Sequence, residues 1–252
     1  MFGCLGLVVG AMPAGAQDAP LQLHYAAYSH GFNVIILDTT LSLHPGDYRL
    51  QVDYRTSGVV GMVMNADGST IVDGRFVDGR AVPREMFSKG HIHGELRVSQ
   101  IDWHDGSPRV VQLVPTSEPG RDGVPERDQA NTIDTLSAMA GLLHRVATTH
   151  RCDGSARTFD GRRLSEIDVH TVGEETLEPT GRSIFQGPAL RCDFTGRQIG
   201  GFMHDQDEAT LRKPQQGSAW FARLQPGAPM VPVRMVFTTA RFGDMTMYIS
   251  AP

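Results

Sequence analysis

"DYRLQVDYR", residues Asp47 to Arg55, is the stretch of sequence that decides the fold. Apolar or aromatic residues alternate in it with charged or amide residues. Successive side chains of a strand point to opposite faces, so this period of two predicts a strand with one buried and one solvated face. The buried face would carry Tyr48, Leu50, Val52 and Tyr54. The same alternation recurs at Leu21, Leu23 and Tyr25, and at Val231, Val233, Met235 and Phe237.

Asp-Gly dipeptides punctuate the chain between its apolar runs. Both residues tolerate positive φ, so the dipeptide favours tight hairpin turns, and seven copies indicate an antiparallel, mainly β architecture. They lie at Asp67-Gly68, Asp73-Gly74, Asp78-Gly79, Asp105-Gly106, Asp122-Gly123, Asp153-Gly154 and Asp160-Gly161. The further strands that we predict are Val34 to Leu43, Val59 to Met64, Glu95 to Asp102, Val110 to Val114, Arg163 to Val172, Leu190 to Phe194 and Met245 to Ser250.

One segment, at about residues 131–148, has helical instead of strand periodicity. Apolar residues recur there at steps of three and four, which predicts an amphipathic helix that packs on a sheet face or plugs an opening. They are Ile133, Leu136, Ala140, Leu143 and Ala147. Asn131 or Thr132 is the predicted N-cap. Residues 118–129 and 205–217 are predicted loops, the second with a short helix.

The first sixteen residues have the character of an export signal. They are uncharged, apolar through Val9, and end in Ala14-Gly15-Ala16, which fits the small-x-small cleavage pattern. We therefore predict a signal peptide over 1–16 that is cleaved after Ala16, a single domain over 17–252, and a periplasmic location. The pattern departs from the usual signal because no Lys or Arg precedes the apolar run.

Cleavage of that leader removes Cys4 and leaves Cys152 and Cys192. In an oxidising compartment an isolated pair of cysteines favours a disulfide, and two buried free thiols are the alternative. The close spacing of a redox-active C-x-x-C pair is absent, so the predicted role of the bridge is structural.

Several short motifs together resemble a known family. They are Thr132-Ile133-Asp134-Thr135-Leu136-Ser137-Ala138, Cys152, Phe159-Asp160-Gly161-Arg162-Arg163 and Cys192, with Leu23-His24-Tyr25 near the start and Pro232-Val233-Arg234 near the end. The chain resembles the bacterial envelope family called domain of unknown function 3108. That resemblance implies a periplasmic protein without an assigned chemistry. A likeness in layout to envelope-integrity proteins implies one long antiparallel sheet that curls into an open barrel or β-spiral, with a disulfide.

Composition and motifs argue against several functions. The formal net charge of −5 disfavours nucleic-acid binding, which needs a basic face. The sequence lacks a G-x-S-x-G elbow, a phosphate-binding loop, H-E-x-x-H and a dinucleotide fingerprint. We therefore predict no catalytic residues, no cofactor and no integral membrane segment. The adjacent carboxylates Glu174 and Glu175 are predicted to lie on a solvated turn.

His91 and His93 form a His-x-His pair, which is a candidate for metal binding. On one strand the two rings would point the same way and could share an ion, with His104 or Glu95 to complete the set. Solvated strand residues are the alternative, and we predict no metal site.

Two groups of residues are candidates for binding a ligand. Methionine adapts to irregular apolar ligands, and five methionines lie on predicted strands, where filling the core is the alternative role. They are Met62, Met64, Met235, Met245 and Met247. Arg162 and Arg163 could bind an anion; alternatively, they pair with Asp160 or Asp168 and brace a hairpin turn.

These observations lead to one functional expectation and two alternatives. We expect a non-enzymatic binding or structural module in cell-envelope maintenance, which holds a lipid-like or peptide ligand in an open β barrel. The first alternative is a hydrolase that acts on an envelope polymer, which would need a cleft of titratable groups. The second is a scaffold that only recruits protein partners.

Overall fold

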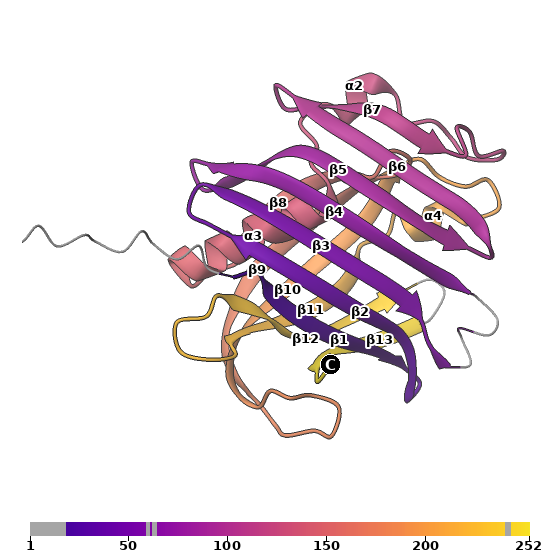
Figure 1. The fold of residues 1–252 in the computed structure, drawn as a ribbon. Coiled ribbons are helices and arrows are strands. Elements are labelled where there is room, and N and C mark those ends of the chain that lie inside the picture. The colour runs from indigo at the N-terminus through magenta and orange to yellow at the C-terminus, as the bar shows by residue number, and fades with distance from the viewer. Residues whose placement is uncertain (1–18, 59–60, 62–64, 240–242) are drawn as a thin grey trace, which may run out of the picture.

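The computed structural model describes residues 19–58, 61, 65–239 and 243–252, and its dominant feature is one antiparallel sheet (Figure 1). The sheet has thirteen strands in the order β7-β6-β5-β4-β3-β2-β1-β13-β12-β11-β10-β9-β8. Their bounds are β1 Leu21–Ser29, β2 Phe32–Leu43, β3 Asp47–Thr56, β4 Ala66–Val77, β5 Arg80–Ile92, β6 Glu95–His104, β7 Ser107–Val114, β8 Gly154–Phe159, β9 Leu164–Leu177, β10 Gly187–Gly200, β11 Gln215–Arg223, β12 Met230–Thr239 and β13 Gly243–Ser250. The predicted mainly β fold is confirmed.

The sheet curls but does not close. Every neighbouring pair of strands is consecutive in the chain except β1 and β13, which pair from His24 opposite Ser250 to Ser29 opposite Met245. This pairing joins the two ends of the chain at the middle of the sheet. The two edge strands are therefore β7 and β8, from the middle of the chain, and we call the gap between them the seam.

Two-residue turns connect four of the hairpins. Asp78-Gly79 and Asp105-Gly106 form two of them, with φ of 49° and 72° and of 50° and 77°. Positive φ at both residues matches the twist of the flanking strands, which confirms this use of Asp-Gly. His30-Gly31 and His93-Gly94 form the other two in the same conformation, which was not predicted from the sequence.

Four of the seven Asp-Gly pairs are not turns, and the prediction was wrong for them: Asp122-Gly123 lies in an irregular segment, Asp153-Gly154 leads into β8, and two pairs lie inside β4. Gly68 and Gly74 lie inside β4, directly opposite Tyr54 and Tyr48 of β3. A Cβ atom on Gly68 would lie 2.7 Å from the Tyr54 ring, and one on Gly74 would lie 2.3 Å from the Tyr48 hydroxyl. These glycines make room for the aromatic side chains of the neighbouring strand.

Helix α3, Thr135–Thr149, lies inside the curl and contacts β3, β4, β5, β8 and β12 (Figure 1). Ala140 and Leu143 of its inward face are buried, as the periodicity predicted, but Val146 completes this face and the predicted Ala147 is exposed. The predicted N-cap was wrong. Asn131 has a φ of 59°, and Asp134 is the cap, whose Oδ1 accepts a hydrogen bond of 2.7 Å from the Ser137 amide.

The segment before the helix covers part of the edge of β8, which explains the later helix start. Ile133 forms a parallel bridge with Thr158. Its amide donates to the Arg157 carbonyl at 3.0 Å, and its carbonyl accepts from the Phe159 amide at 2.9 Å. Ile133 is therefore extended instead of helical, and the helix begins only at Thr135.

Several other boundaries differ from prediction. β4, β5, β8 and β11 were not predicted, because polar residues and glycines obscure their alternation. The predicted strand Val59 to Met64 lies outside the described residues apart from Gly61. Short helices α2, Glu126–Gln129, and α4, Glu208–Leu211, lie in the two predicted loops.

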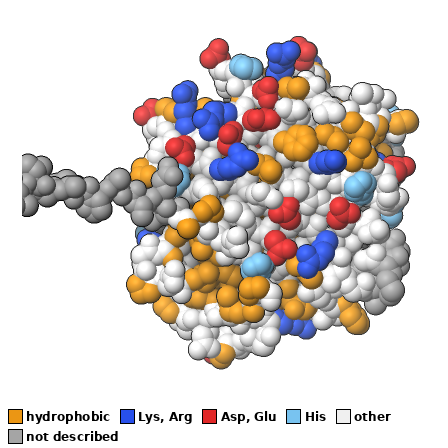
Figure 2. Space-filling view, viewed as in Figure 1, with side chains coloured by type: hydrophobic (Ala, Val, Ile, Leu, Met, Phe, Trp, Pro, Cys, Tyr) orange, Lys and Arg blue, Asp and Glu red, His pale blue; other side chains and the backbone are white. Residues whose placement is uncertain are grey.

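Within the described residues, no helix is both long and apolar enough to cross a membrane. Figure 2 shows the outer face of the sheet, where charged side chains of both signs are scattered among apolar ones.

A disulfide joins Cys152 to Cys192, as predicted. Cys152 follows α3 and precedes β8, and Cys192 lies within β10, with a Cα–Cα distance of 6.2 Å. Both cysteines are fully buried in the core. The bridge therefore fastens the end of the helix and the start of edge strand β8 to the sheet.

Replacing both cysteines by serine is expected to lower the free energy of unfolding by about 4 kcal/mol, because the bridge closes a loop of 40 positions in the unfolded chain. Urea titration of the purified protein measures this. Thiol counting on the denatured, unreduced wild type gives the control: no reactive thiol if the leader with Cys4 is removed, one if it is retained. Two or more thiols in the purified protein would contradict the bridge.

Asp134 supplies a second test of the core. Burial raises its pKa above the ordinary value of 3.8, against the hydrogen bonds from Ser137 that lower it, and its Oδ2 atom has no hydrogen-bond partner among the described residues. A raised pKa in the folded state contributes stability at low pH that is lost as pH rises through that pKa. The stability of wild type relative to Asp134→Asn is therefore expected to fall as pH rises from 3.8 upward.

Urea titrations of wild type and Asp134→Asn across this range measure the difference. Asp134→Ala is the matched variant that also removes the cap, and it is expected to cost about 1 kcal/mol more than Asn. A wild-type advantage that grows with pH would contradict the assignment.

Candidate functional site

The seam between the edge strands contains a cleft of about 860 Å³. One wall is β7, which contributes Ser107 to Val110 and Leu113. The opposite wall comes from the end of β8 and the turn after it, with Phe159 and Arg162. The segment 116–130, which follows β7 and includes α2, completes the lining. It contributes ten residues: Thr116, Ser117, Glu118, Arg121, Asp122, Gly123, Val124, Glu126, Gln129 and Ala130.

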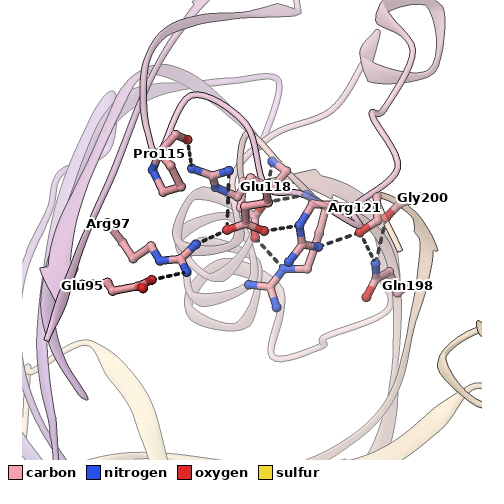
Figure 3. Close-up of polar contacts among 11 residues, drawn as sticks. Glu95, Arg97, Pro115, Glu118, Arg121, Gln198 and Gly200 are labelled. Carbon is pink, nitrogen blue, oxygen red and sulfur yellow. Dashed lines mark hydrogen bonds and ion pairs between the residues drawn. The ribbon is translucent and has the colours of Figure 1, made fainter. Parts of the chain in front are cut away.

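A carboxylate with three arginines lies beside this cleft (Figure 3). Glu118 accepts hydrogen bonds from Arg97 of β6 and from Arg121, and Nη1 of Arg162 lies 3.5 Å from its Oε1. The side chain of Glu118 is 11% exposed, and those of Arg121 and Arg162 are 17% and 15% exposed. We call these four residues the clasp.

The clasp joins the two sides of the seam. Arg97 belongs to the β7 side and Arg162 to the β8–β9 turn. Arg162 also donates to the Pro115 carbonyl at 2.6 Å, and Arg121 donates to the Gly201 carbonyl beyond β10 at 2.7 Å. Side-chain bonds thus hold together two edges that have no strand pairing with each other.

The turn after β8 fits against β6 without a gap. Ser99 Oγ donates to the Asp160 carbonyl at 2.8 Å. A Cβ atom on Gly161, whose φ is 93°, would lie 2.8 Å from Ser99 Oγ and 3.0 Å from Leu113. Glycine is therefore required there both by the backbone conformation and by the close approach of the opposite edge.

The electrostatics of the clasp keep Glu118 ionised. Burial alone would raise its pKa, but the hydrogen bond from Arg121 and the charges of Arg121, Arg162 and Arg97 outweigh it and hold the pKa below the ordinary 4.5. Burial also lowers the pKa of Arg162, against the charge of Glu118 that raises it. A carboxylate held in this way is a poor proton donor at neutral pH, so its chemistry is ion pairing.

The two arginines predicted to bind an anion have separate roles. Arg162 belongs to the clasp and lines the cleft. Arg163 is 58% exposed and its Nε donates to Asp160 at 2.9 Å. The Asp160 carboxylate also accepts from both backbone amides, at 2.9 Å from Arg162 and 2.7 Å from Arg163. The turn thus has the braced geometry that was the alternative to an anion site.

The described methionines that were predicted to bind a ligand pack within the sheet. Met235 and Met247 are partners on β12 and β13 and lie against the main core, and Met245 is buried beside Ala27 and Val34. None of the three lines the seam cleft. Met62 and Met64 lie outside the described residues.

The histidine pair does not have the geometry that a shared metal would need. His91 lies on β5 with its Nδ1 3.5 Å from Asp67, whereas His93 lies in the turn after the strand with a φ of 53°. In the described part of the chain, no three His, Cys, Asp or Glu residues could together hold a metal ion. Glu174 and Glu175 lie on β9, not on a turn, and bond to His150 and to Arg191 and Trp220.

A family model described as "Protein of unknown function (DUF3108)" matches residues 22–250. The chain belongs to this family. No curated protein matches it. Among solved structures, a β-barrel-like protein of domain of unknown function DUF1849 from Brucella abortus matches with a TM-score of 0.53 and 11% identity, over 93% of this chain and 97% of that one. A candidate lipoprotein from Parabacteroides distasonis matches with a TM-score of 0.37 and 10% identity, over 92% and 94%.

The Brucella abortus structure agrees with the open, barrel-like fold of this DUF3108 member and, at its low identity, shows the fold alone. Three of the four clasp residues were not predicted from the sequence. Glu118 and Arg121 lie in a segment that was predicted to be a flexible loop. Their spacing of three, typical of local ion pairs, was the available signal.

Replacing Glu118 by Gln is expected to lower the free energy of unfolding at neutral pH by about 2 kcal/mol, because it leaves three arginines without their carboxylate. This expected loss is smaller than the loss for a fully buried ion pair, because the side chain of Arg97 is 32% exposed. A carboxylate whose pKa is lowered in the folded state contributes stability that is fully present above pH 4.5. This stability is lost as the pH falls from 4.5 through the lowered pKa. The difference between wild type and variant is therefore expected to shrink in acid.

Glu126→Gln is the matched control, since Glu126 lines the same cleft and is exposed. It is expected to change the free energy of unfolding by under about 0.5 kcal/mol. Equal effects of the two substitutions, or a Glu118 effect that grows as pH falls, would show that the clasp does not hold the seam.

Proposed function

We propose that this protein is a non-enzymatic binding module of the periplasm, exported by a signal peptide cleaved after Ala16, and that it holds an extended peptide in the seam cleft. The observation that carries the proposal is that edge strand β7 lines an open cleft. β7 pairs with β6 on one side only. The backbone groups on its other side are available to a further strand, and strand addition is a common mode of peptide recognition.

The lining of the cleft suits a peptide. Val110, Leu113, Val124 and Phe159 offer apolar surface for alternate side chains of an extended ligand. Three arginines, Arg109, Arg121 and Arg162, face three carboxylates, Glu118, Asp122 and Glu126, so the formal charge of the lining is balanced. A balanced lining favours a ligand with mixed side chains over a strongly charged one.

A lipid-like ligand is the second candidate, favoured by the same four apolar residues. Helix α3 and core side chains occupy the interior of the curl, so an acyl chain would also have to lie in the seam. The two candidates differ in one respect that can be measured: a peptide strand would bond to the β7 backbone, whereas an acyl chain would not.

Hydrogen exchange of the mature protein tests the proposal with two probes. The first is a pool of decapeptides with alternating apolar and polar residues, and the second is a fluorescent fatty acid. The pool is expected to slow exchange of alternate amides in residues 107–114, and the fatty acid to leave them unchanged. Binding of the fatty acid alone would support the lipid-like ligand, and the absence of binding by either probe would overturn the proposal.

Ser117→Trp and Val111→Trp make a matched pair of variants for this experiment. Both positions are exposed, but Ser117 lines the cleft and Val111 does not. The indole at 117 is expected to weaken peptide binding tenfold or more by filling the cleft, and the indole at 111 to leave it within about twofold. Equal loss in both variants would place the peptide elsewhere.

A further inference from the structure

A second cleft, of about 660 Å³, opens where β5 and β6 diverge. The two strands pair only from Glu85 opposite Asp102 onward, so residues 80–84 of β5 have no partner on β6. The β6–β7 turn at 104–106 and the segment 131–133 close the other side of the cleft. None of its lining residues is shared with the seam cleft.

The charge of this lining is opposite to that of the whole chain. Arg75, Arg80 and Arg84 line the cleft with a single carboxylate, Asp105, whereas the chain has a formal net charge of −5. Arg84 lies 3.2 Å from Asp73, but no carboxylate of the described residues lies within ion-pair distance of Arg75 or Arg80. Two guanidinium groups in the lining thus have no anionic partner among the residues that the structure describes.

The remaining lining includes a buried apolar base. Pro83 and Trp103 are buried, and the indole N–H of Trp103 donates to the Thr132 carbonyl at 2.7 Å. Since that N–H is already used, Trp103 contributes the apolar surface of its ring. The base is therefore held by packing, while the three arginines are exposed residues of β4 and β5.

We propose that this second cleft binds a phosphate monoester. Arginine presents paired N–H groups that match two phosphate oxygens at once. A phosphate monoester carries a charge of about −1.5 to −2 at pH 7, which complements the two guanidinium groups without an anionic partner better than a single carboxylate or a phosphodiester does. The monoester could belong to a soluble sugar phosphate or to the headgroup of a lipid such as phosphatidic acid. The proposal does not depend on the peptide ligand of the seam.

Titration of the mature protein with glycerol 3-phosphate, followed by tryptophan fluorescence and calorimetry, tests the site. The chain has two tryptophans, so Trp220→Phe leaves Trp103 as the reporter beside the cleft. Saturable binding at about millimolar concentration or tighter, weakened by added salt, is the expected result. Absence of saturable binding by calorimetry would overturn the proposal.

Variants locate the binding. Arg75→Ala with Arg80→Ala is expected to weaken binding tenfold or more, and lysine at both positions to weaken it less, because charge remains while the paired N–H geometry is lost. Arg55→Ala with Arg223→Ala is the control with the same change of charge at exposed positions outside the cleft. Circular dichroism checks that each variant is folded. If the control variant loses the same amount of affinity, the effect comes from net charge alone and the proposed site is wrong.

Vesicles distinguish the two sources of the monoester. Phosphatidylcholine vesicles that contain phosphatidic acid present the group on a surface, and vesicles with phosphatidylglycerol present a phosphodiester instead. Preference for phosphatidic acid that depends on Arg75 and Arg80 supports a lipid headgroup, and binding of glycerol 3-phosphate without vesicle binding supports a soluble ligand. Equal binding of both vesicle types would contradict selectivity for a monoester.

Discussion

The pairing of β1 with β13 is the constraint on which the rest of the structure depends. All other neighbouring strands are consecutive hairpins, so this single ladder decides that the ends of the chain meet in the middle of the sheet. The edges of the sheet then come from the middle of the chain. The connection between them, from the end of β7 to the start of β8, contains α3, and placing that helix inside the curl covers the concave apolar face of the sheet.

The polar character of the seam follows from this arrangement. Exposed strand edges invite pairing with other chains, and proteins usually protect them with charge or with covering segments. In this protein the edges of β7 and β8 are covered in different ways. Ile133 bonds to the edge of β8, whereas on the β7 side the clasp ties β6 and the segment after β7 to the opposite turn through side chains. Water can replace these side-chain hydrogen bonds and ion pairs more readily than it can replace the backbone bonds between two strands. The clasp also leaves the edge of β7 beside an open cleft.

Features that depend on local sequence could be predicted, and those that depend on distant contacts could not. Alternation at residues 47–55 identified β3, and the steps of three and four identified α3. Gly68 and Gly74 were misread as turn residues because their reason lies in the tyrosines of another strand. The clasp was missed for the same reason, since residues 97, 118 and 162 meet only when the sheet curls. The start of α3 was misplaced because a bridge to β8 keeps Ile133 extended.

The disulfide lies on the β8 side of the seam and the clasp spans the seam, and this difference limits how the seam can open. The bridge from Cys152 to Cys192 fastens the start of β8 to β10, and the same segment leads directly from α3. The β8 side is therefore fixed covalently to the core. In the described chain the Glu118 pairs cross the seam through side chains, whereas β6 is also packed into the main core through Ile101 and Trp103. If the seam widens for a ligand, the Glu118 pairs across it must break, while the apolar contacts of β6 with the core can persist.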